Sequence, residues 1–195
     1  NDRKELSKYP LDYNGITKYS GRNISPIYSY RPGAYGLAGS FYKCLIKAYN
    51  ENWSYLLFLE DDAVPILPPN QFNQRFNEVI TSLPNNGVGI FMLGLTVRCQ
   101  TNKNDKIKWI QVKSQRNYVN GAHACLISKE YIKILFEYIQ TNGINMPIDV
   151  FLDDFNPWLW FGDLSENGMF RGLYKQLYLN CSNYLSYPGP INSSK

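Results

Sequence analysis

An apolar run that ends abruptly in three carboxylates is the feature of this chain that most restricts its fold. The run is Tyr-Leu-Leu-Phe-Leu at residues 55–59, and Glu60, Asp61 and Asp62 follow it directly. Such a short, unbroken apolar run is typical of a strand that is buried on both faces in a parallel sheet. Ligands of open α/β sheets bind outside the carboxyl ends of the strands, so we expect the three acids to lie at a binding edge.

The three carboxylates at this strand end predict a metal–diphosphate site. Neighbouring carboxylates repel one another unless a cation lies among them. Magnesium and manganese are commonly held by one or two carboxylates together with substrate phosphates, so Mn²⁺ or Mg²⁺ is the expected cofactor. The alternative is a solvated acidic turn, and Pro65 and Pro68 do indicate a turn just beyond the acids.

Composition is typical of one globular domain. The chain has 195 residues, of which 44% are hydrophobic and 18% charged, enough to bury a substantial core. The net charge of +4 fits an anionic ligand, but no run of Lys and Arg exceeds two residues, so we expect no nucleic-acid partner. No apolar stretch is long enough to span a membrane.

The cysteines predict a reducing compartment. Cys44, Cys99, Cys125 and Cys181 are widely spaced and form no zinc-like cluster, and two of them lie in apolar segments. We therefore expect free thiols and a cytoplasmic location.

Apolar spacing predicts alternating helices and strands through the middle of the chain. Residues 1–35 and the part after residue 161 are expected to be irregular, apart from one short helix near the start. Asn70 is the expected N-cap of the second helix and Ser128 that of the third. Helices are expected at residues 36–50, at 70–83 and after 128, and again at 147–155; strands are expected at 55–59, 88–93, 107–112 and 122–127. This order predicts an α/β domain with a mostly parallel central sheet flanked by helices.

Three blocks of the sequence resemble glycosyltransferase family 25, which includes bacterial lipopolysaccharide and collagen galactosyltransferases. The first is the Gly-x-x-Gly-x-x-x-Ser pattern at residues 33–40, and the second runs from Trp53 to Asp62. The third reads Gly-Ala-His-Ala-Cys-Leu-Ile-Ser at residues 121–128 and is followed by Pro147-Ile148-Asp149. The chain departs from the family at Phe41, where His is usual, and in lacking a counterpart to the family's opening strand.

The resemblance implies a GT-A-like fold and a single catalytic domain over residues 1–195, as one module of a larger protein. The chain resembles the small glycosyltransferase domains of large DNA viruses as much as the bacterial enzymes; a viral origin would mean the host cytoplasm. The implied activity is metal-dependent, inverting transfer of a hexose from a nucleoside-diphosphate sugar, most simply a UDP-hexose, to a glycan or glycoprotein acceptor. The alternatives are an inactive carbohydrate-binding module and a sugar nucleotidyltransferase.

Taken together with the resemblance, residue type and position predict roles for individual residues. Asp62 and Glu60 are the expected metal ligands, and Asp149 or Asp153 is the expected catalytic base. Donor binding is expected of Glu60, Asp61, Gly36, Ser40, Arg31 and Lys43, and acceptor contacts of Trp158, Trp160 and Asp154.

Each of these roles has a plain structural alternative. Asp149 can instead balance a helix dipole, and the two tryptophans can instead pack in the core. His123, the only histidine, is either a metal or phosphate contact or a hydrogen-bonded structural residue. Arg22, Arg31 and Lys43 are candidate contacts of the diphosphate, and each can instead be ordinary surface charge. Ser40 can instead simply lie within a helix.

Overall fold

A computed structural model describes residues 3–18, 32–97, 109–111, 119–160 and 170–176. Arg22, Arg31, Cys99 and Cys181 lie outside these residues, so their expected roles stay predictions.

The centre of the protein is a mixed β-sheet. Its strands follow the order β1-β5-β3-β6-β4, and β7 pairs with the far half of β3. Only β3 and β6 run parallel; every other pair in this sheet is antiparallel. The strands are β1 (Tyr55–Leu59), β3 (Ile90–Val97), β4 (Trp109–Gln111), β5 (Val119–Ser128), β6 (Trp158–Trp160) and β7 (Phe170–Gly172).

The expectation of a mostly parallel sheet is therefore wrong. β1 and β3 do run in the same direction, but β5 lies between them and runs the opposite way. An apolar run indicates that a strand is buried, but it carries no information about the direction of the neighbouring strands. The sequence therefore could not predict this order.

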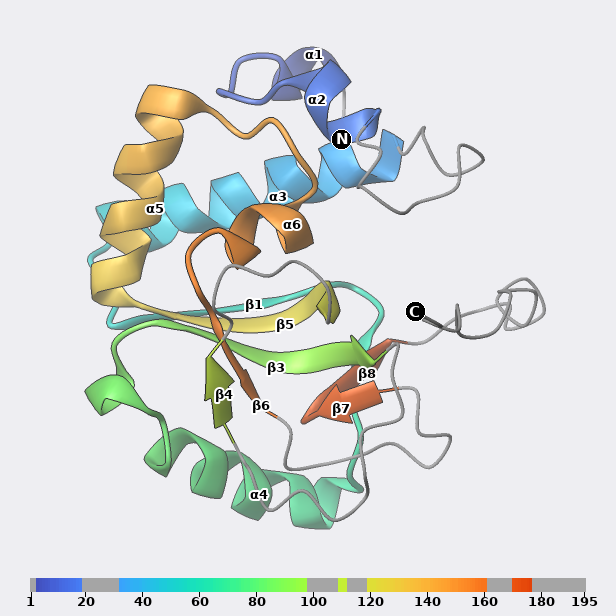
Figure 1. Cartoon of the computed structure of the whole chain (residues 1–195), viewed down its shortest axis with the longest axis vertical. Helices are drawn as coiled ribbons and strands as arrows, with labels where there is room; N and C mark the ends of the chain where they lie inside the picture. The colour runs from blue at the N-terminus through green and yellow to red at the C-terminus, as the bar shows by residue number, and fades with distance from the viewer. Residues whose placement is uncertain (1–2, 19–31, 98–108, 112–118, 161–169, 177–195) are drawn as a thin grey trace, which may run out of the picture.

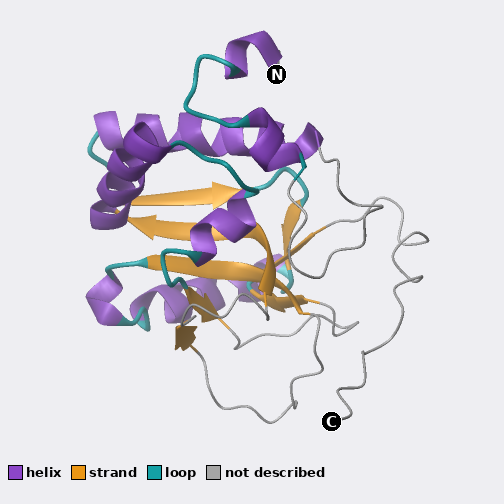
Figure 2. Ribbon diagram, turned by 45° about the horizontal axis from the view of Figure 1, so that its top comes forward, coloured by secondary structure: helices purple, strands orange, loops and turns teal. Residues whose placement is uncertain are grey.

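Helices cover both faces of the sheet, as the sequence predicts for an α/β domain. Helices α3 (Pro32–Asn50), α5 (Lys129–Asn142) and α6 (Ile148–Asp153) lie on one face, and α4 (Pro69–Thr81) lies on the other (Figure 1). The tilted view shows the same layers, with strands between the helices (Figure 2). A larger core cluster lies between the sheet and α3, α5 and α6, and a smaller one lies on the α4 side.

Strand β1 is not buried on both faces, so that expectation is also wrong. Leu56 and Phe58 are 3% and 5% exposed and pack in the larger core, whereas Tyr55, Leu57 and Leu59 are 36–42% exposed. Among the described residues β1 pairs only with β5, which makes it an outer strand.

The described residues before α3 form two short helices, where the sequence predicted one. They are α1 (Arg3–Leu6) and α2 (Tyr13–Thr17). The carboxylate of Asp12 accepts a 3.0 Å hydrogen bond from the Asn14 amide and so caps α2. A bridge between Leu11 and Ile144 ties this region to the loop after α5.

Of the two expected N-caps, Asn70 is wrong and Ser128 is confirmed as the N-cap residue. The residue before α4 is Pro68, so Asn70 lies inside the helix and is not its N-cap. Ser128 is the N-cap residue of α5, but its hydroxyl accepts a bond from the Gly89 amide and makes no capping hydrogen bond to the helix.

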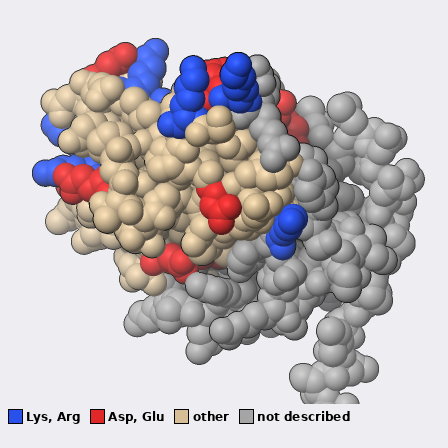
Figure 3. Space-filling model, turned by 90° about the horizontal axis from the view of Figure 1, so that it is seen from above, with Lys and Arg blue, Asp and Glu red and all other residues tan. Residues whose placement is uncertain are grey.

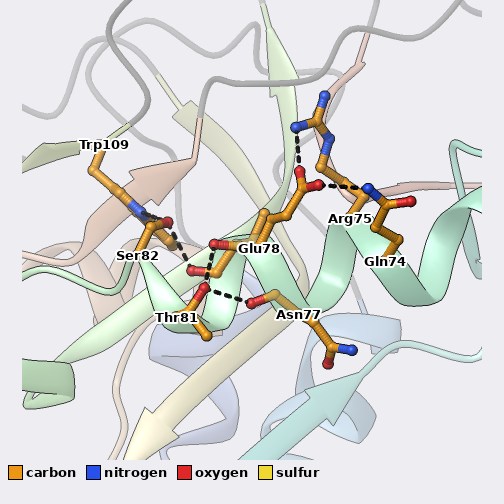
Figure 4. A network of polar contacts seen from close by, with 8 residues as sticks. Gln74, Arg75, Asn77, Glu78, Thr81, Ser82 and Trp109 are labelled. Atoms are coloured by element: carbon orange, nitrogen blue, oxygen red, sulfur yellow. Dashed lines mark hydrogen bonds and ion pairs between the residues drawn. The ribbon is translucent and has the colours of Figure 1, made fainter.

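Polar contacts along α4 fix the far end of that helix (Figure 4). The carboxylate of Glu78 accepts hydrogen bonds from Gln74 and Arg75. The indole of Trp109 donates a 3.2 Å bond to the hydroxyl of Ser82, which joins β4 to the end of α4. A 3₁₀ turn (Asn85–Gly87) with left-handed Asn85 and Asn86 then leads into β3.

A second, two-stranded sheet lies beside the end of β1. It consists of β2 (Ala63–Pro65) and β8 (Tyr174–Gln176), paired antiparallel. With β7, it shows that the described part of the chain after residue 161 contains strands, so the expectation of an irregular C-terminal region is wrong there.

Candidate functional site

The acidic turn, defined as Glu60, Asp61 and Asp62, connects β1 to β2. At its start, the amide of Glu60 donates a 3.0 Å hydrogen bond to the carbonyl oxygen of His123 in β5. The amide of Ala63 then donates a 3.1 Å bond to the carbonyl oxygen of Glu60 and closes the turn. Three carboxyl groups are thereby held at the carboxyl end of β1, where the sequence predicts them.

The three acids differ in their exposure. Asp61 is exposed, whereas Glu60 and Asp62 are half-buried. The Oδ1 atom of Asp62 is buried and has no hydrogen-bond partner in the described part of the chain. Burial of the carboxyl group raises the pKa of Asp62, and the neighbouring charge of Asp61 raises it further. A buried acceptor without a partner is costly, so Asp62 is the member of the turn that a bound cation would stabilise most.

The carboxylates of the acidic turn provide some of the ligands that a hard cation needs. Carboxylate oxygens are the ligands that Mg²⁺ and Mn²⁺ prefer, and Asp62 and Glu60 provide them. Within the described residues, no three His, Cys, Asp or Glu side chains form a group that could hold a metal ion by themselves. A metal at this turn would thus depend on ligand phosphates or water for its remaining contacts, which is the usual arrangement for magnesium.

His123 is fully buried beside the acidic turn, in β5. Its Nε2 atom lies 3.2 Å from the carbonyl oxygen of Tyr174 in β8. Since a carbonyl oxygen only accepts, Nε2 carries the proton and donates it. Desolvation lowers the pKa of His123 to about 4, and the bond to Tyr174 opposes that shift. The ring is therefore neutral at pH 7 and makes the hydrogen bond expected of a structural histidine.

The residues of the first sequence block lie along α3. Gly33, Gly36 and Ser40 follow one another at helical spacing, and a Cβ atom at either glycine would meet no described atom within 4 Å. The ammonium group of Lys43 lies 2.6 Å from the Glu5 carboxylate. Figure 3 shows basic and acidic side chains close together on this helix-covered side. Lys43 thus already pairs with a carboxylate, whereas Gly36 and Ser40 stay candidates for donor binding.

The expected base lies on a different element from the acidic turn. Asp149 is in the first turn of α6, and its Oδ1 atom accepts a 3.0 Å bond from the Val150 amide. Asp149 and Asp153 are half-buried, and Asp154 is exposed at the end of the same helix. α6 packs its apolar side into the larger core through Ile148, Phe151 and Leu152. The position of α6 does not test the expected catalytic and acceptor-binding roles of the three aspartates, which stay predictions.

The two tryptophans of β6 differ in their burial. Trp160 is 2% exposed and its ring lies 5.1 Å from that of Trp109, within the core on the α4 side. Core packing, the alternative stated for it above, thus accounts for Trp160. Trp158 is half-buried and packs against the same cluster, so it keeps a surface that an acceptor could contact.

The two described cysteines are free thiols. Cys44 is half-buried and Cys125 is fully buried, where desolvation raises the pKa of its thiol.

Two residues near the turn were missed by the sequence analysis. A Cβ atom at Gly94 would lie 2.4 Å from the Nε2 atom of His123, so β3 can approach the ring only with glycine there. An isolated glycine in an apolar strand is a known sign of close approach and could have revealed Gly94. No sequence signal points to the Tyr174 carbonyl.

Comparison with known proteins gives no further assignment. No protein-family model matches the chain, and no curated protein matches its sequence. Of the helices in the described residues, none has both the length and the apolar character needed to cross a membrane.

Proposed function

We propose that this protein is a metal-dependent glycosyltransferase of GT-A type, which moves a hexose from a nucleoside-diphosphate sugar, UDP-hexose in the simplest case, to a glycan or glycoprotein acceptor. The observation that carries the proposal is the acidic turn at the carboxyl end of β1, with the buried, unpartnered Oδ1 atom of Asp62. A mixed α/β sheet with helices on both faces is compatible with that fold type. The resemblance of three sequence blocks to glycosyltransferase family 25 supports the same reading.

The carboxylates of the acidic turn would hold the cation. Asp62 and Glu60 supply its protein ligands, while Asp61, which is exposed, is free to face the hydroxyl groups of the donor. When bound, Mn²⁺ or Mg²⁺ neutralises the charge that develops on the departing nucleoside diphosphate. With that charge neutralised, no acid is needed to protonate the leaving group.

The acceptor hydroxyl must lose its proton as it attacks the donor sugar. A carboxylate within hydrogen-bond reach of the hydroxyl can take that proton. We assign this role to Asp149, with Asp153 one helical turn further along α6 as the next candidate. The acceptor would approach over α6, and Trp158 and the exposed Asp154 are the proposed acceptor contacts.

A thermal-shift panel tests the proposal. UDP-glucose, UDP-galactose and UDP are each added with Mn²⁺, with Mg²⁺ and with a chelator. A ligand at one hundred times its dissociation constant stabilises the folded state by about 2.7 kcal/mol, which is easily measured. We expect stabilisation by nucleotide only when metal is present, and only if Asp62 is intact.

The matched control for Asp62→Asn is Glu78→Gln, which removes an exposed carboxylate on α4. Stabilisation by free sugars without nucleotide would instead favour a carbohydrate-binding module. Stabilisation by nucleoside triphosphates together with a sugar phosphate, but not by nucleotide sugars, would favour a nucleotidyltransferase.

A further inference from the structure

The acidic turn lies between two sheets, which contact each other where β8 packs against β3, β7 and β5. Its first residue is bonded to β5 through the Glu60 amide. The strand after it, β2, pairs with β8, where Ala63 lies opposite Gln176 and Pro65 opposite Tyr174. The position of the carboxylates therefore depends on how β8 is held against β5 and β3.

His123 bonds both to the start of the acidic turn and to β8. Its backbone carbonyl accepts the 3.0 Å bond from Glu60, and its ring donates the 3.2 Å bond to the carbonyl oxygen of Tyr174. One residue thus joins the start of the acidic turn to β8, the strand that pairs with β2 directly after the turn. Both the ring and the backbone of Tyr174 are held, since its side chain is 6% exposed and packs edge-on against Phe72.

The surrounding backbone leaves the ring little freedom. A Cβ atom at Gly94 would lie 2.4 Å from Nε2 and 2.5 Å from Cδ2 of His123, so the backbone of β3 lies directly against the imidazole. The pairing of β3 with β5 shifts register on both sides of Gly94, as at a β-bulge. Next to it, the amide of Leu173 donates a 2.6 Å bond to the carbonyl oxygen of Leu93, and the amide of Ile66 donates a 2.9 Å bond to the carbonyl oxygen of Leu173.

We propose that His123 is a positioning residue, which fixes the acidic turn between the two sheets through its ring and its backbone carbonyl. Its effect on ligand binding rests on the proposed function, because the turn is the proposed metal site. His123 acts on the turn through the hydrogen bond of its ring to Tyr174 and through its backbone carbonyl.

The variants separate the hydrogen bond from the volume of the ring. His123→Gln keeps an N–H donor near the position of Nε2, whereas His123→Met keeps a side chain of similar size without a donor. Gly94→Ala leaves His123 unchanged but displaces its ring, because the new methyl group would overlap it. Ser128→Ala is the matched control: it removes a buried 3.1 Å hydrogen bond from the Gly89 amide at the other end of β5, away from the turn.

Two quantities are measured on each variant. Amide hydrogen exchange of a peptide covering residues 60–66 reports whether the turn is held. Equilibrium binding of UDP as a function of Mn²⁺ concentration reports whether the carboxylates are placed for metal. Loss of one buried hydrogen bond typically changes an equilibrium constant by about tenfold.

We expect His123→Met and Gly94→Ala to speed exchange over residues 60–66 and to weaken Mn²⁺-dependent UDP binding, each by about tenfold. His123→Gln should stay within about twofold of the wild type on both measures, since one donor is retained. Ser128→Ala should lower the melting temperature without changing either measure.

The inference is overturned if His123→Gln behaves like His123→Met, or if Ser128→Ala has the same effects as His123→Met, because the histidine would then contribute only general stability. If the wild-type protein shows no Mn²⁺-dependent UDP binding, the proposed function fails. Hydrogen exchange then still decides whether His123 positions the turn.

Discussion

The amide of Glu60 donates a hydrogen bond of 3.0 Å to the carbonyl oxygen of His123, and this bond places the only histidine of the chain beside its only run of three acids. The two residues are 63 positions apart in sequence and meet because β1 pairs antiparallel with β5. The candidate metal ligands thus follow β1, whereas the residue that bonds to the start of their turn belongs to the neighbouring strand β5. The carboxylates are accessible or half-buried, and the imidazole beside them is buried and neutral.

Asp62→Asn should raise the stability of the metal-free protein at pH 7. Because the pKa of Asp62 is raised in the folded state, its contribution to stability is fully present below the ordinary pKa of aspartate and is lost as pH rises through the folded value. At neutral pH the wild-type carboxylate is ionised at a cost that the amide avoids. The advantage of the variant in a chelator-treated denaturation experiment should therefore shrink as pH falls towards the ordinary aspartate range. A variant less stable than wild type at pH 7 would contradict a carboxylate that is destabilised by burial at this position.

The buried histidine should make the protein sensitive to mild acid. The pKa of His123 is lowered to about 4, so its contribution to stability is present above the ordinary histidine value of 6.5 and is lost as pH falls towards 4. Between pH 7 and 4.5, the wild type should lose about 2 to 3 kcal/mol of unfolding free energy relative to His123→Gln, which has no titrating group at this position. Urea denaturation at both pH values measures this difference. Equal losses in the two proteins would show that His123 titrates normally.

Asp149→Asn should slow sugar transfer by about 10²–10⁴-fold, the range typical of a positioned general base. The substitution keeps the size and the hydrogen-bonding capacity of the side chain, so donor affinity should hardly change. The measurement is transfer to acceptor alongside donor titration, with Asp153→Asn and Asp154→Asn as controls from the same helix. Intact transfer in Asp149→Asn combined with loss in Asp153→Asn would place the base one helical turn further along α6. Loss of donor binding in Asp149→Asn would move the residue to the sugar pocket.

All four cysteines should react with an alkylating reagent under denaturing, non-reducing conditions. Cys44 and Cys125 are free in the structure, and the spacing of Cys99 and Cys181 predicts the same for them. In the native protein Cys44 should be labelled well before Cys125, because the latter is fully buried with a raised pKa. Intact-mass spectrometry over a time course measures both. A pair that resists alkylation after denaturation would reveal a disulfide.

The elements of the core could be predicted from sequence because local apolar spacing determines them. The helix begun at residue 36 in the prediction is α3, whose buried Phe41, Leu45 and Ala48 repeat at helical intervals. Strand β5 and the helix after Ser128 were predicted in the same way, although β5 is longer than expected. Apolar spacing predicts which face of a helix is buried, as in α3 and α5, and the continuous apolar run of β5 fits a strand whose residues 123–128 are all buried.

Pairing between distant strands could not be predicted, because no local signal encodes it. The apolar residues of β1 suggested burial on both faces, yet Leu57 and Leu59 are exposed. The short strands β2 and β8 pair although about 110 residues separate them in the sequence. Tyr174 contacts His123 through its backbone carbonyl group, which every residue carries. At the candidate site, the sequence therefore indicated the acids but not the histidine bond that holds them.

Equilibrium dialysis of labelled UDP-glucose and UDP-galactose tests the central claim most directly. The account predicts that the wild-type protein binds at least one of these donors with Mn²⁺ present, that a chelator abolishes the binding, and that Asp62→Asn abolishes it while Glu78→Gln retains it. Binding that is indifferent to the chelator, or equal in Asp62→Asn and wild type, would contradict a metal–diphosphate site at the acidic turn.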